Sequence, residues 1–177
     1  MTNPKMKTIY TIGHSTHSFE DFSHMLQSFK IEVLVDVRSL PWSRKFPQFN
    51  KESLENTLPE VDIQYMHMAD LWGRRKVKKD SHNTRWNNLS FRGYADYMET
   101  DEFKNAVQKL EDIAHKKVAA YMCSEAVWWR CHRSMISDFL KLRGWKVLHI
   151  MWKGKTQEHP YTAPARIVDN QLLYTQE

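Results

Sequence analysis

The sequence predicts an α/β fold, in which a single domain over residues 1–177 holds a mostly parallel sheet flanked by helices. Short apolar, β-branched segments alternate with helical segments along the chain, which is typical of βαβ units with right-handed crossovers. The length of 177 residues is enough for one good core and too short for two ordinary domains. No internal repeat or linker interrupts the alternation.

Five segments have the composition of strands. They are residues 8–12, 32–38, 63–68, 118–122 and 146–151. Residues 32–38 are almost continuously apolar, as in a parallel strand that is covered on both faces. Near the end of the chain, residues 165–168 and 171–174 flank Asp169-Asn170, a turn typical of a hairpin. The elements therefore predict a Rossmann-like or flavodoxin-like sheet plus a C-terminal β-hairpin.

Helices are predicted between these strands. Ser18 caps the first helix, with Asp21 placed as in a capping box, and Asn50 caps a short second one. Two more helices cover residues 91–98 and 100–116. The last helix covers residues 131–143 and is stopped by Gly144. A long polar stretch, residues 70–88, is predicted to be a loop, and loops of this length are usually functional or mobile.

Composition narrows the class of protein. The chain is 41% hydrophobic and 27% charged, which is typical of globular proteins. No apolar run is long enough to span a bilayer, and residues 1–7 lack the apolar core of a secretory signal, so we expect no membrane partner. Two cysteines fit a reducing compartment, and we expect a cytoplasmic protein. The net charge of +5 suits an anionic ligand, or simply a soluble surface.

Polar residues gather where the predicted strands end. His14 and Ser15 follow the first strand, Asp36 and Arg38 end the second, and Cys123 ends the fourth. Ligands of open parallel sheets bind at the carboxyl ends of the strands. We therefore expect these side chains, together with Arg133 at the start of the next helix, to surround one cleft.

Several stretches carry a resemblance to a known family. They are Tyr10-Thr-Ile-Gly-His-Ser15, Val35-Asp-Val-Arg-Ser39, Phe46-Pro-Gln-Phe-Asn50, Ser90-Phe-Arg-Gly-Tyr-Ala-Asp-Tyr97, Cys123-x-Glu-x5-Cys-His-Arg133 and His159-Pro160. In this order they resemble DUF488, a bacterial family named as a domain of unknown function. The resemblance implies an α/β domain with a shared polar site, and supplies no reaction. Trp72 departs from the Leu-Gly-Gly expected in relatives, and is predicted to narrow the pocket.

The cysteine motif is the strongest candidate for chemistry. Arg130, Arg133 and the start of the following helix form a potential anion site, and their field favours a thiolate at Cys123. A buried, structural Cys123 is the alternative interpretation. In the catalytic one, Cys123 is the nucleophile, while Arg130 and Arg133, with His14, Ser15 and Arg38, bind the substrate's negative charge.

Acid–base partners are available in the same set. Asp36, Glu125 and His132 are candidate general acids or bases. Asp36 interrupts an apolar strand and needs a partner there, so it is alternatively an internal ion pair with Arg38 or Arg133. Glu125 is alternatively a cap that accepts N–H groups of the helix.

Three function classes follow. The first is an enzyme, a thiol-dependent hydrolase or transferase that acts on a small anionic or nucleotide-like substrate. The second is a nucleic-acid-binding module that uses the basic loop 72–79 and tryptophans such as Trp86, Trp128 and Trp129. The third is a metal-dependent enzyme, with ligands from Cys123, Cys131 and His132 joined by His14 or Asp36. The sequence names no cofactor.

Overall fold

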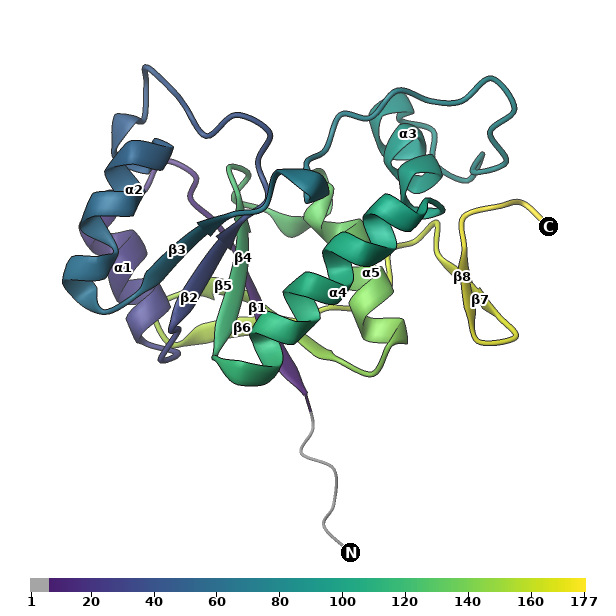
Figure 1. Ribbon diagram of the computed structural model, residues 1–177. Helices are drawn as coiled ribbons and strands as arrows, with labels where there is room; N and C mark the ends of the chain where they lie inside the picture. Colours follow the sequence, from purple (N-terminus) through teal and green to yellow (C-terminus); the bar gives the residue numbers. More distant parts are fainter. Residues whose placement is uncertain (1–6) are drawn as a thin grey trace, which may run out of the picture.

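The computed structural model describes residues 7–177, so the predicted absence of a signal in residues 1–7 lies almost wholly outside it. Figure 1 shows a central sheet with helices on both faces. Its strands are β1 (Thr8–Gly13), β2 (Val33–Asp36), β3 (Gln64–His67), β4 (Ala119–Cys123), β5 (Lys146–Trp152) and β6 (Lys155–Glu158). The strand order is β3-β2-β4-β1-β5-β6, and only β6 runs antiparallel to its neighbour. The predicted α/β class and mostly parallel sheet are confirmed.

The strand order places β1 and β4 side by side at the centre of the sheet. It differs from the Rossmann order 3-2-1-4-5-6 and the flavodoxin order 2-1-3-4-5, because β4 lies between β1 and β2. Gly13 at the end of β1 is in register with Cys123 at the end of β4. The two strand ends that carry His14 and the cysteine motif are therefore direct neighbours.

Five α-helices connect the strands. They are α1 (Phe19–Gln27), α2 (Lys51–Thr57), α3 (Leu89–Met98), α4 (Asp101–Lys116) and α5 (Arg133–Leu142). The predicted cap of α1 is confirmed, since the Ser18 side chain accepts a hydrogen bond from the Asp21 N–H. Asn50 is the N-cap residue of α2, as predicted, but its side chain does not cap the helix, because Asn50 Oδ1 accepts from the Ser43 N–H of the preceding loop. Gly144 ends the α5 region with a φ of 94°, as expected of a helix stop.

The core forms two layers, one on each face of the sheet. Helices α1 and α2 cover one face, where Phe22, Met25 and Leu54 pack against strand residues such as Leu34 and Met122. Helices α3, α4 and α5 cover the other face, and pack against the alternate residues of the same strands. Residues of β2 and β4 are buried on both faces, which explains their continuous apolar pattern.

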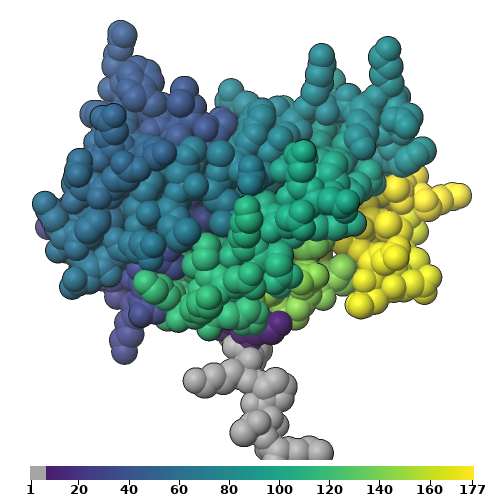
Figure 2. Space-filling model, in the orientation of Figure 1, coloured from purple at the N-terminus to yellow at the C-terminus, as the bar shows by residue number. Residues whose placement is uncertain are grey.

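The C-terminal hairpin consists of β7 (Arg166–Val168) and β8 (Gln171–Leu173). Asp169 and Asn170 both have positive φ, 50° and 61°, which is the backbone of a two-residue hairpin turn, so this prediction is confirmed. Figure 2 shows the hairpin, in yellow, at one side of the molecule. Tyr174 joins it to the core beside α5. Among residues 7–177, no helix has the length and apolar character needed to cross a membrane.

Candidate functional site

An open cleft lies at the carboxyl ends of the parallel strands. One lobe, of about 450 Å³, is lined by residues that include His14, Ser15 and Phe46. The other lobe, of about 670 Å³, is lined by residues that include Cys123, Arg130, Cys131, His132, Gly73 and Arg74. Both lobes share Arg38, Leu40, Trp42, Ser124 and Glu125. Seven of the nine predicted site residues therefore line this cleft, and the other two lie beneath it.

Cys123 lies at the floor of the larger lobe, where β4 ends. The guanidinium of Arg133 donates from Nη1 to the Cys123 sulfur over 3.2 Å, and the same nitrogen donates to the Glu125 carbonyl over 3.1 Å. Arg133 Nη2 donates to the Ala126 carbonyl. Arg133 is 1% exposed, so it holds the thiol and its loop from below. This placement makes it a partner of the sulfur, and it has no surface for the substrate contact that the sequence suggested.

The charge of Arg133 changes the acidity of the thiol. Burial raises the pKa of Cys123, but a hydrogen bond from the Cys131 thiol, the Arg133 cation and the Glu125 backbone together lower this pKa to about 7. Burial and the neighbouring Cys123 raise the pKa of Cys131 well above its ordinary value. Near neutral pH, Cys123 is therefore the more acidic thiol of the pair, and Cys131 stays protonated.

Glycine is required where β1 passes the cysteine loop. A Cβ on Gly13 would lie 1.6 Å from the Glu125 carbonyl oxygen and 2.8 Å from Arg133 Nη1. The hydrogen bonds of β1 and β4 continue past the sheet, since the His14 and Ser15 N–H groups donate to the Cys123 and Ser124 carbonyls. The Gly13-His14-Ser15 segment thereby fixes the position of the thiol.

Asp36 forms a closed ion pair. Arg38 Nε donates to Asp36 Oδ1 over 2.9 Å, Arg38 Nη2 donates to Oδ2 over 2.7 Å, and the Tyr65 hydroxyl also donates to Oδ2. Asp36 has no exposed surface and does not line the cleft. The geometry therefore matches the internal ion pair considered from the sequence, and the catalytic role of Asp36 stays a prediction without a route to the cleft.

The smaller lobe contains His14 and Ser15. The His14 ring stacks on Phe49 with a centroid distance of 4.4 Å, and its Nδ1 is bonded to the Ser15 carbonyl. Burial, and secondarily the cation of Arg38, lower the pKa of His14 to about 4. His14 is therefore neutral at pH 7 and can offer only a neutral hydrogen bond to a ligand.

Glu125 and Arg130 are exposed at the rim of the cleft. The predicted helix cap by Glu125 is wrong, because α5 begins at Arg133 with no side-chain cap. Within residues 7–177, neither side chain takes part in an ion pair, and the same holds for Arg74 on the opposite wall. One carboxylate and two arginines are thus free to face a ligand.

His132 lies behind Cys131. Its Nδ1 is 3.6 Å from the Cys131 sulfur, and its ring contacts Tyr94. Burial lowers the pKa of His132 to about 4, so the ring is neutral near pH 7. Gly73 allows this packing, because a Cβ there would lie 2.7 Å from His132 Nδ1. His132 can exchange a proton only with Cys131 or with a ligand that enters this end of the lobe.

Sequence reasoning missed the apolar wall of the cleft. Leu40 and Trp42 line both lobes and are 76% and 61% exposed. Their loop, bracketed by Pro41 and Pro47, was the available signal. The tryptophans of the cysteine motif are placed differently, since Trp128 is buried and stacks on His149, and Trp129 is exposed outside the residues that line the cleft.

The basic loop after β3 packs on helix α3 and is hydrogen-bonded to it. The Arg75 guanidinium lies between the rings of Trp72 and Tyr97, at 4.2 and 3.6 Å from their centroids. The Lys78 N–H donates to Asp96 Oδ2, and Gly93 lets the Arg75 carbonyl approach, where a Cβ would lie 1.9 Å away. Trp72 packs on Arg75 and does not line the cleft, so the predicted narrowing of the pocket by Trp72 is wrong.

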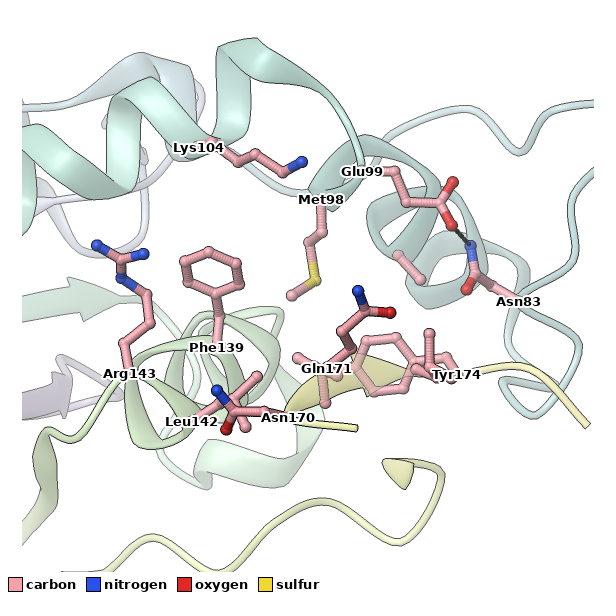
Figure 3. Close-up of a pocket in the computed structure, with 13 residues that line it drawn as sticks. Asn83, Met98, Glu99, Lys104, Phe139, Leu142, Arg143, Asn170, Gln171 and Tyr174 are labelled. Carbon is pink, nitrogen blue, oxygen red and sulfur yellow. Dashed lines mark hydrogen bonds between the residues drawn. The ribbon is translucent and has the colours of Figure 1, made fainter. Parts of the chain in front are cut away.

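A second hollow lies outside the cleft at the strand ends. Figure 3 shows it between α3, α4, α5 and the hairpin, with Met98, Phe139 and Tyr174 around an apolar interior and Lys104 at its edge. Its volume is about 520 Å³. Its lining includes none of the predicted site residues, so the chemistry that the motifs predict belongs to the cleft at the strand ends.

The possible metal site can be examined in the same geometry. Over residues 7–177, no group of three or more histidine, cysteine, aspartate or glutamate side chains is arranged to hold a metal ion. The Asp36 carboxylate already accepts hydrogen bonds from Arg38 and Tyr65, and His14 Nδ1 is hydrogen-bonded to the Ser15 carbonyl. These atoms are therefore occupied by protein partners.

Comparison with known proteins gives one finding. A family model described as "Domain of unknown function DUF488" matches residues 18–140, which is more than half of the chain. The matched region includes β2, β4 and the whole cysteine motif. Neither the curated proteins nor the solved structures include a match to this chain.

Proposed function

Since the chain belongs to the DUF488 family, whose description names no reaction, we propose from its geometry that it is a thiol-dependent hydrolase or transferase for a small anionic substrate. One observation carries the proposal: a buried arginine, Arg133, donates to the sulfur of Cys123 at the floor of an open cleft. A cation at this distance stabilises the thiolate, which is the nucleophilic form.

The cleft supports an anionic substrate. Arg74 and Arg130 face the lobe that contains Cys123, and Arg38 lies where the two lobes meet. Because Arg38 is already paired with Asp36, the net positive charge available to a ligand comes from Arg74 and Arg130. Guanidinium groups bind carboxylate and phosphate oxygens with paired hydrogen bonds, and these two are the proposed substrate clamps.

The remaining residues suggest an order of events. The Cys123 thiolate attacks the electrophilic atom of the substrate, and the bond to the leaving group breaks. Glu125, at the rim of both lobes, is placed to protonate the leaving group and then to take a proton from water or from a second acceptor. The oxygen of that water or acceptor attacks the intermediate, and the bond to the Cys123 sulfur breaks to restore the thiolate. Reduced thiols are needed throughout, so we place the protein in the cytoplasm.

Two alkylating agents test the thiolate and the charge of the cleft together. Iodoacetamide is neutral and iodoacetate is anionic, and both react with thiolates. Trypsin cleaves after Arg130 and leaves Cys123 and Cys131 on separate peptides, so that each rate is measured in the same wild-type chain. We expect Cys123 to react faster than Cys131 near pH 7, with a midpoint near its pKa of about 7.

Matched variants complete this test. We expect the ratio of iodoacetate to iodoacetamide reactivity at Cys123 to fall in Arg130→Gln and to stay at the wild-type value in Arg166→Gln, which changes an arginine of the hairpin. Equal, slow reaction of both cysteines would contradict the thiolate. A fast Cys123 with the same ratio in all three proteins would contradict anion binding by Arg130.

One observation favours a second candidate function, the binding of single-stranded nucleic acid. Trp42 is 61% exposed on the wall between the two lobes, beside Arg38 in the lining of both. An exposed tryptophan among arginines can stack on a base. Affinity for a short oligonucleotide that falls steeply with salt, and that Trp42→Ala weakens, would support this class.

A further inference from the structure

The two cysteines of the chain form a local pair of sulfurs. The side chain of Arg133 donates to the Cys123 sulfur over 3.2 Å, and the backbone N–H of the same residue donates to the Cys131 sulfur over 3.5 Å. Both residues line the larger lobe of the cleft. Both sulfurs therefore lie within 3.5 Å of nitrogens of the same residue, in the same lobe of the cleft.

The two sulfurs differ in chemical state. Cys123 ends a strand at the centre of the sheet and is held by a cation, whereas Cys131 precedes the first turn of α5 and is held by a backbone N–H. The segment between them includes Ser124, Glu125 and Ala126, which are all exposed. One member of the pair is therefore the more acidic sulfur, at the end of a central strand, and the other is a protonated thiol just before helix α5.

We propose that Cys123 and Cys131 are a redox pair that reduces a small hydroperoxide and closes to an intramolecular disulfide. This inference rests on the proposed function for the ionisation of Cys123, and it adds a second reactant class and a role for Cys131. The low exposure of both cysteines, 3% and 6%, fits an oxidant as small as hydrogen peroxide.

Cys123 reacts with the peroxide first, and Cys131 reacts second. The Cys123 thiolate attacks one peroxide oxygen, so that an S–O bond forms and the O–O bond breaks, and the departing oxygen leaves as water or an alcohol after taking a proton. Cys123 is then a sulfenic acid. The Cys131 sulfur attacks the Cys123 sulfur, an S–S bond forms, and the S–O oxygen leaves with the Cys131 proton as water. The pair is oxidised by two electrons, the peroxide is reduced by two, and a dithiol reductant restores both thiols.

Arg133 suits the first of these steps. Its Nη1 contacts the attacking sulfur, so that it favours the ionised form in which this sulfur attacks. Its Nε is buried and has no hydrogen-bond partner among the described residues. The guanidinium therefore has a donor left over in the ground state.

The experiment uses the full chain, fully reduced, with an equimolar amount of hydrogen peroxide. Tryptic digestion without reductant reports the product, because cleavage after Arg130 separates Cys123 from Cys131 unless a disulfide joins their peptides. We expect most of the wild-type chain to yield the joined peptides and to lose them on treatment with dithiothreitol. We expect Cys131→Ser to gain one oxygen at Cys123, trapped by dimedone, and Cys123→Ser to remain unmodified.

The outcomes separate this inference from the proposed function. A wild-type chain that keeps a stable sulfenic acid at Cys123, as Cys131→Ser does, would overturn the redox pair while the thiolate stands. If neither cysteine is oxidised, although Cys123 alkylates rapidly near pH 7, the peroxide activity is overturned alone. If Cys123 neither alkylates nor oxidises, both proposals fail. The wild-type peptide map needs no variant, so it decides the question even if a serine variant does not fold.

Discussion

Two arginines lie near the same edge of the sheet, and their partners differ in kind. Arg38 donates two hydrogen bonds, from Nε and Nη2, to the carboxylate of Asp36, and the Tyr65 hydroxyl donates a third to the same carboxylate. Arg133 is bound to a thiol and to two backbone carbonyls. In the part of the chain that the structure describes, no carboxylate lies within 4.0 Å of Arg133.

The difference determines which pair is reactive. The charge of Arg38 is neutralised at any pH at which Asp36 is ionised, so this pair contributes a fixed, closed structure. The charge of Arg133 is neutralised locally only when Cys123 loses its proton. A buried cation without a permanent counterion stabilises the thiolate and lowers the pKa of its neighbour. The Arg38 pair therefore supports the fold, and the Arg133 pair is the one on which the proposed chemistry depends.

Arg133→Met should have the largest effect, because it removes the cation beside Cys123 and leaves the Arg38 pair intact. Without the cation, the pKa of Cys123 should rise from about 7 towards its ordinary value of 9.0, because burial still opposes ionisation while only the hydrogen bonds from Cys131 and the Glu125 backbone remain to favour it. The thiolate fraction at pH 7 therefore falls, by up to about 50-fold where the pKa reaches 9.0, and we expect alkylation to slow by the same factor. The measurement is the pH profile of iodoacetamide labelling at Cys123.

Arg133→Lys is the matched control, since a lysine keeps the positive charge but has one nitrogen in place of the three of the guanidinium. Its labelling rate should lie between those of wild type and Arg133→Met. A thermal melt of each variant, run beside the labelling, reports whether the chain is folded. If folded Arg133→Met labels as fast as wild type at pH 7, Arg133 does not control the thiol.

Asp36→Asn removes the partner of Arg38, and we expect the opposite result to that of Arg133→Met. The chain should lose much of its stability, while the reactivity of Cys123 should not change. The change leaves Arg38 without its counterion in a site where Asp36 has no exposed surface. Breaking a buried pair on one side costs about 3–5 kcal/mol, which for a chain of this size corresponds to a fall of about 10 °C in melting temperature. Labelling of Cys123 at pH 7 should be unchanged.

Asp80→Asn, which changes an exposed carboxylate, should leave the melting temperature within about one degree of wild type. The opposite pattern would reverse our assignment. If Asp36→Asn keeps its stability and slows the labelling or the turnover that depends on Cys123, Asp36 belongs to the reacting groups.

The fold was predictable because its core follows local patterns. The almost continuously apolar run at residues 33–37 indicated a strand buried on both faces, and Asp169-Asn170 indicated the hairpin turn. Strand β6 was missed for a physical reason. All four of its residues, Lys155–Glu158, are exposed, so no apolar period marks it, and only pairing with β5 makes it a strand.

The site was predictable in position but not in its pairings. Strand ends placed Asp36 and Cys123 at one edge of the sheet, and the structure confirms that location. The sequence offered Arg38 and Arg133 equally as partners for Asp36, because the choice depends on which way each side chain turns. Leu40 and Trp42 carried no pattern beyond the proline between them and Pro47 further on, and only tertiary packing makes them the wall of the cleft.

The smallest expected effect is on the pH dependence of stability, to which one histidine beside each arginine contributes. Burial, and to a lesser degree the neighbouring cation, lower the pKa of His14 beside Arg38 and of His132 beside Arg133 to about 4. In the unfolded chain each takes a proton below about pH 6.5, while the folded chain keeps it neutral, so stability is lost as the pH falls from about 6.5 towards 4. We expect each histidine to contribute about 1–2 kcal/mol of this loss by pH 5.

The measurement is the free energy of unfolding in urea at several pH values. Between about pH 6.5 and 5, this free energy should fall less in His132→Phe and in His14→Phe than in wild type, and by the same amount in both variants. His82→Gln, which changes an exposed histidine, is the control and should behave as wild type. Equal effects are expected because burial, the largest cause at both sites, does not depend on how the arginine is paired. A larger effect for His132→Phe would mean that the uncompensated charge of Arg133 acts beyond the thiol.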